Sequence, residues 1–177
     1  MKSEIRETSE NQFKICAAAG NNLMQDLIDY WNIMFKDTYI FTLYIEEDEY
    51  SNNDAVLHIE NVNNGRLMRY IVEHKYRAFN RRHLEKVYNN ELLLEKSKYL
   101  FLNQRANDLD IDGIMYINTL IDGTNIVFKW KANWEYFNLR PTKRTCPIKS
   151  CGDDNTEKDK TVYMLSTNAE YCRIYYI

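Results

Sequence analysis

Three side chains of this sequence are of the types that hold a divalent cation and stabilise charge beside it. They are Asp54, Glu73 and Lys75. Mg²⁺ prefers hard oxygen ligands and is commonly held by one or two carboxylates together with waters and substrate phosphates. Such an ion polarises a phosphoryl oxygen and lowers the pKa of its bound water, while a neighbouring ammonium stabilises the charge that gathers on phosphorus. The set would suit hydrolysis of a phosphodiester if the fold brings it together.

A hairpin is the element that must position these residues. The segment from Asp54 to Arg77 contains two strand-like runs, and Asn64-Gly65 between them is a strong hairpin signal because both residues tolerate positive φ. A two-residue turn on Asn64-Gly65 predicts that Glu60 lies opposite Arg69, an opposite-charge pair that would support the register.

The same register places Val56 opposite Glu73 and Asp54 opposite Lys75. Side chains alternate with period two along a strand, so Asp54, Glu73 and Lys75 are expected on one face. A turn on Asn63-Asn64 would keep this face, whereas a three-residue loop would move Asp54 to the other one.

Charge is distributed unevenly along the chain, although the net charge is only -3. The segment from Asp37 to Glu60 holds seven acidic residues and no Lys or Arg, and the segment from Arg66 to Arg105 holds ten basic residues against four acidic ones. A basic segment beside isolated carboxylates suits an enzyme that binds phosphates and cations together. The alternative explanation is that these charges lie on solvated helix faces, which often cluster charge without a binding function.

The remaining pattern predicts one mixed α/β domain. Apolar residues at helical spacing predict a first helix from about Ile15 to Phe35, and a β-branched and aromatic run predicts a strand over 37–46. We expect a helix over 80–107, continuous or interrupted at Asn89-Asn90, and a second hairpin around Asp122-Gly123. Residues 141–160 read as loop, and 161–166 as a closing strand.

Asp54, eighteen intervening residues and then Glu73-His74-Lys75 resemble the signature of the PD-(D/E)XK nuclease superfamily. The resemblance covers about Asn22 to Lys131, in the order helix, three strands, helix and strand. It implies a restriction-endonuclease-like α/β core, a central mixed sheet flanked by helices, over about 15–131, with a C-terminal extension over 132–177. It also implies metal-dependent cleavage of DNA.

The resemblance further implies which residues would act. Asp54, Glu73 and the backbone carbonyl of His74 would ligate Mg²⁺ or Mn²⁺, and Lys75 would orient or help deprotonate the attacking water. Many members of the superfamily carry an additional acidic ligand on the first helix, for which Asp26 is the best match. Asp29 and Glu10 match less well.

Four basic residues after or near the motif are candidates for substrate contact. Lys98 matches the helix position at which related nucleases contact substrate or nucleophile, and its alternative role is an exposed pair with Glu91 or Glu95. Arg77, Arg81 and Arg82 would grip DNA phosphates just past the strand that carries the motif.

Other functions remain open from the sequence. The Asp54, Glu73 and Lys75 set could be a cross-strand ion-pair cluster, which stabilises by only about 0 to 1 kcal/mol per exposed pair. The domain could keep the nuclease fold without catalysis, as a nucleic-acid-binding or virion-type interaction protein. Cys146, Cys151 and Cys172 could hold zinc in an interaction domain, although their spacing is loose for such a site.

The polar opening of the chain and the absence of a long apolar run predict a cytoplasmic protein with no membrane partner, in the host cytoplasm if phage-encoded. Phage, mobile-element and repair nucleases are not distinguished by these residues. Endo- or exonuclease action, a preference for DNA structure or ends, and homodimerisation are likewise left open.

Overall fold

The computed structural model describes residues 19–46, 54–132, 142–147 and 157–177. A helix over 19–34 comes first, and α2 (Arg81–Val87) and α3 (Lys96–Asp108) follow. The strands are β1 (Tyr39–Ile45), β2 (Ala55–Asn61), β3 (Leu67–Arg77), β4 (Glu91–Glu95), β5 (Gly113–Leu120), β6 (Thr124–Lys131), β7 (Thr142–Pro147), β8 (Glu157–Ser166) and β9 (Cys172–Tyr176).

Six of these strands form a mixed central sheet in the order β1-β2-β3-β5-β6-β9. β3 and β5 are parallel, and the other neighbouring pairs are antiparallel. A second, three-stranded sheet has the order β4-β8-β7. Sheets and helices together confirm the predicted α/β class.

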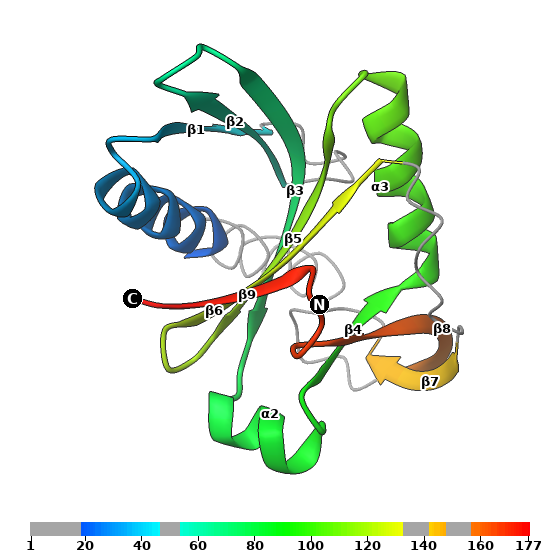
Figure 1. The fold of residues 1–177 in the computed structure, drawn as a ribbon. Helices are drawn as coiled ribbons and strands as arrows, with labels where there is room; N and C mark the ends of the chain where they lie inside the picture. The colour runs from blue at the N-terminus through cyan, green and yellow to red at the C-terminus, as the bar shows by residue number, and fades with distance from the viewer. Residues whose placement is uncertain (1–18, 47–53, 133–141, 148–156) are drawn as a thin grey trace, which may run out of the picture.

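The helix over 19–34 and α3 lie on opposite sides of the central sheet (Figure 1). On the side of the first helix, Leu27 and Trp31 pack with Val72 of β3. On the side of α3, Leu102 and Ala106 pack with Ile71 of β3 and with residues of the smaller sheet. Successive residues of β3 therefore enter two different cores, as expected for a strand covered on both faces.

The β2–β3 hairpin forms as predicted, but its register is shifted by two residues. Ala55 pairs with Val72 and Val56 with Ile71, so the predicted pairings of Val56 with Glu73 and of Glu60 with Arg69 are wrong. The loop has four residues, with Asn61 N–H bonded to the Arg66 carbonyl at 2.9 Å. A shift of two preserves the face, so Asp54 stays on the side of Glu73.

The segment predicted as one helix over 80–107 is a helix, a strand and a second helix. Asn89 and Asn90 have φ of 51° and 60°, a left-handed conformation that ends α2. The following ELLLE alternates half-buried and buried residues and forms β4. The interruption was predicted at the correct place, but β4 was missed.

The C-terminal part of the chain contributes to both sheets. β8 pairs with β4 and β7 in the small sheet, and β9 pairs with β6 in the central sheet. β7 and the start of β8 fall in the segment over 141–160, which the sequence led us to read as loop, so that reading is wrong there. The second hairpin, β5–β6, forms where it was predicted.

Candidate functional site

Glu73 is a fully buried carboxylate in the middle of β3. Its strand neighbours Ile71 and Lys75, two residues away on either side, share its face. This face lies on the side of α3, where Ile71 belongs to an apolar core. Because burying a charge is costly unless it is paired, the surroundings of Glu73 define the site.

Two lysines pair with Glu73, one on each carboxylate oxygen. Lys75 Nζ lies 2.9 Å from Glu73 Oε1, and Lys98 Nζ, from the first turn of α3, lies 3.0 Å from Oε2. The lysine side chains are 35% and 27% exposed. Glu73 thus lies at the buried end of the site, and the two ammonium groups lie between it and the solvent.

Burial and the neighbouring charges have opposing effects on the pKa of each group in this cluster. Burial raises the pKa of Glu73 and the charge of Asp54 adds to the rise, whereas Lys75 and Lys98 oppose it. Burial would lower the pKa of Lys75, but the negative charges of Glu73 and Asp54 outweigh it and raise that pKa. Lys75 is therefore an ammonium ion at neutral pH.

Asp54 lies at the start of β2 and is tied to β3. Its Oδ2 accepts a hydrogen bond of 2.6 Å from the backbone N–H of His74. Because the N–H and C=O of one strand residue point to the same side, the His74 carbonyl also faces the place where β2 begins. Asp54 is therefore held close to β3, where its charge acts on both Glu73 and Lys75.

The His74 side chain lies on the other face, as expected from the alternation of the strand. Its Nε2 lies 2.9 Å from Thr119 Oγ1, which in turn donates to Asn125 Oδ1 at 2.6 Å. Burial lowers the pKa of His74 to about 4, and the positive charge of Lys75 acts in the same direction. The imidazole is thus a neutral packing group.

Arg77, a predicted phosphate ligand, points into the protein. Its Nε donates to Asn118 Oδ1 at 2.8 Å, and its Nη2 donates to Tyr116 Oη at 2.6 Å and to the Leu93 carbonyl at 3.2 Å. All of these contacts connect the end of β3 with β5 and β4. The guanidinium is engaged within the fold.

The two other arginines lie on α2. Arg81 pairs with Glu85 at 3.0 Å and reaches Thr167, whereas Arg82 is exposed. Of the three arginines, Arg82 is the most accessible to a DNA backbone.

Tyr116 and Asn118 belong to the site but were not predicted as members. They lie on β5 beside Glu73 and Lys75, with which they are in register. Both are buried, and Asn118 Nδ2 has no hydrogen-bond acceptor among the residues described. Only the parallel pairing of β3 with β5, across 43 residues of sequence, brings them here.

Asp26 is not brought to the cluster. It is exposed on the helix over 19–34, which packs on the sheet face opposite Glu73. Asp29, exposed on the same helix, accepts a hydrogen bond from Gln25, and Glu10 lies outside the described residues. In the part of the chain that the structure describes, no three His, Cys, Asp or Glu side chains form a metal-binding group.

The zinc alternative falls largely outside the described residues. Cys16 and Cys151 lie outside them, and the side chain of Cys146 is not described. Cys172 is a buried free thiol on β9, and burial raises its pKa to about 11. A thiol in that state is a core residue and a poor metal ligand.

Within the described ranges, no helix is both long enough and apolar enough to cross a bilayer. Comparison with models of known protein families, with curated proteins and with solved structures yields no match to this chain.

Proposed function

We propose that this protein is a metal-dependent deoxyribonuclease whose reacting centre is formed by Asp54, Glu73, Lys75 and Lys98. The observation that carries the proposal is the burial of Glu73 between two lysines, beside a second carboxylate. An apolar residue would fit that position of the core at lower cost. Charged groups retained in such a place commonly serve a function.

The topology supports a PD-(D/E)XK core. A helix, the antiparallel strands β1, β2 and β3, the helix α3 and a strand parallel to β3 follow one another, with α2 and β4 inserted before α3. The Asp immediately precedes β2 and the Glu-x-Lys lies in β3, in agreement with the order that the motif requires.

The donor atoms fit Mg²⁺ or Mn²⁺. Asp54 and Glu73 offer hard oxygen ligands on one face, and the His74 carbonyl faces the same edge. Mg²⁺ needs few protein ligands because waters and substrate phosphates complete its octahedron. When bound, the ion would supply Lewis-acid activation of a phosphate and of the attacking water.

Lys75 and Lys98 would act as fixed positive charges. Each forms an ion pair with one oxygen of Glu73. Both are partly exposed, so their ammonium groups are accessible to a phosphate that approaches from solvent. Their role would be to hold the scissile phosphate and to stabilise its developing charge.

A catalytically inactive nucleic-acid-binding protein of the same fold is the second candidate. The observation that favours it is that both oxygens of Glu73 already have ammonium partners, which leaves the four charges of the cluster balanced. In this case the cluster would only fasten α3 to β3.

Cleavage of DNA decides between the two. Linear, supercoiled, single-stranded and branched DNAs are incubated with Mg²⁺ or Mn²⁺ and with wild type, Glu73→Gln or the exposed control Glu60→Gln. We expect wild type and Glu60→Gln to cut at least one substrate, and Glu73→Gln to be slower by about a hundredfold or more. DNA binding without cleavage in either metal would support the inactive protein instead.

A further inference from the structure

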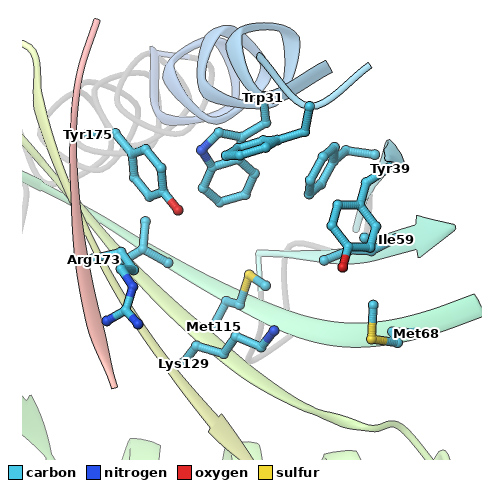
Figure 2. A pocket seen from close by; sticks show the side chains of 11 residues that line it. Trp31, Tyr39, Ile59, Met68, Met115, Lys129, Arg173 and Tyr175 are labelled. Carbon is cyan, nitrogen blue, oxygen red and sulfur yellow. The ribbon is translucent and has the colours of Figure 1, made fainter. Parts of the chain in front are cut away.

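A second site lies on the opposite face of the central sheet from Glu73. Eleven side chains from the first helix, the turn after it and the central sheet line a pocket of about 220 Å³ that is partly open to solvent (Figure 2). An enclosed apolar cavity of about 150 Å³ already accommodates benzene. The volume here is therefore sufficient for a small molecule of one or two rings.

Aromatic rings form much of the wall. The ring centroids of Trp31 lie 5.4 Å from Phe41 and 5.2 Å from Tyr175, and the Tyr175 contact is edge-to-face. Ile59 and Met115 add buried apolar surface. Such walls favour a flat, apolar body, because rings pack on one another in offset or edge-to-face geometry.

Two exposed cationic side chains, Lys129 and Arg173, line the same pocket, and none of its lining residues is a carboxylate. Lys129 Nζ lies 4.5 Å from the centroid of the Tyr70 ring. Arg173 uses Nη1 for the backbone carbonyls of Glu170 and Cys172, both at 2.7 Å. Among the described residues neither cation has a carboxylate partner within ion-pair distance, so the pocket carries a positive charge that is not neutralised locally.

The Trp31 ring lines the pocket, but its indole N–H is buried within the protein. Trp31 is 3% exposed, and its Nε1 has no hydrogen-bond acceptor in the described part of the chain. A buried N–H without an acceptor is costly and uncommon in folded proteins. Because Nε1 itself is inaccessible to solvent, a molecule in the pocket would contact the Trp31 ring and not this atom.

We propose that this pocket binds a small molecule with a flat aromatic body of one or two rings and one anionic group. The body would lie against Trp31 and Tyr175, and the anion, a carboxylate or a phosphate, would lie toward Lys129 and Arg173. Figure 2 shows these four side chains around one space, with Tyr39, Ile59 and Met68 across from Tyr175. The site is independent of the Glu73 cluster, from which the sheet separates it.

Titration of ¹⁵N-labelled protein with 1-naphthoate tests the proposal, with the neutral 1-naphthylmethanol and the cationic 1-naphthylmethylamine as comparison ligands. The reporter is the indole N–H resonance of Trp31, assigned by its loss in Trp31→Phe. We expect 1-naphthoate to shift this resonance saturably, and to bind at least fivefold more tightly than the neutral compound and more tightly still than the cationic one.

Charge variants locate the anion. Lys129→Met and Arg173→Met should each weaken 1-naphthoate about threefold and leave the neutral compound unchanged, because an exposed charge pair contributes modestly. Lys131→Met, which removes the same charge from the same strand outside the pocket, should have no effect. An unshifted Trp31 resonance at millimolar ligand, equal affinity for all three compounds, or equal loss in Lys131→Met would overturn the proposal. DNA cleavage is measured separately and is not expected to change in these variants.

Discussion

Replacement of Arg77 by Met tests whether this side chain supports the fold or grips DNA. The guanidinium donates to Asn118, Tyr116 and Leu93, and so joins the end of β3 to β5 and β4. Met keeps most of the apolar stem and removes every donor. The two roles give different expected results, one in stability and the other in DNA affinity.

The expected loss of stability follows from what the partners retain. In Arg77→Met, Tyr116 Oη still donates to the Leu93 carbonyl at 3.0 Å, so losing the Arg77 donor at Tyr116 should cost little stability. Asn118 is fully buried, and its Nδ2 already has no acceptor among the described residues. In Arg77→Met its Oδ1 would also lose its hydrogen-bond donor. An orphaned buried acceptor costs about 1–3 kcal/mol, and a hydrogen bond to a charged group contributes about 1.5–3 kcal/mol. We expect Arg77→Met to lower the free energy of unfolding by about 3 kcal/mol.

Urea unfolding followed by circular dichroism measures this loss. With a slope of about 2 kcal/mol per molar urea, the midpoint should fall by roughly 1.5 M. Arg82→Met, an exposed arginine on α2, is the matched control and should change the free energy by less than about 0.5 kcal/mol. A loss of less than about 1 kcal/mol in Arg77→Met, together with weakened DNA binding, would refute the structural role.

Three further predictions concern other parts of the molecule. Lys98→Met should slow DNA cleavage at least about tenfold, because it removes the ammonium group that pairs with Glu73. Lys96→Met should leave the rate unchanged, and equal rates in the two variants would contradict the role of Lys98. Gly113→Ala should destabilise the protein by at least about 2 kcal/mol in urea unfolding, because a Cβ at this position would overlap the backbone carbonyl of Trp130 in β6; a neutral effect would contradict this packing. The thiol of Cys172, with a pKa raised to about 11, should be alkylated at pH 8 at least tenfold more slowly in the folded protein than in denaturant, as measured by mass spectrometry of its peptide; similar rates would show that the thiol is accessible.

The sequence predicted the local features on which the site depends. Alternation along β2 and β3 identified the shared face of Asp54, Glu73 and Lys75, and this face survived an error of two residues in the register. The register failed because the loop has four residues, with Gly65 at φ 66°, rather than a two-residue turn centred on Asn64-Gly65. The hairpin signal locates a turn more reliably than it fixes its length.

The features that the sequence missed depend on pairing between distant segments. β4 has five residues, too few to separate a period of two from a helical stripe, and its partner β8 comes some 70 residues later. Arg77 was predicted to contact DNA phosphates, and its acceptors on β5, about 40 residues later in the sequence, were not foreseen. The aromatic pocket likewise collects side chains from the first helix and six strands.

Binding of Mn²⁺, measured by electron paramagnetic resonance, tests the central claim that Asp54 and Glu73 hold one divalent ion between them. We expect wild type to bind one ion per chain at this site. Asp54→Asn and Glu73→Gln should each weaken that binding at least tenfold, while Asp26→Asn, on the other side of the sheet, should leave it unchanged. Binding that is absent from wild type, or that persists undiminished in both carboxylate variants, would contradict the account.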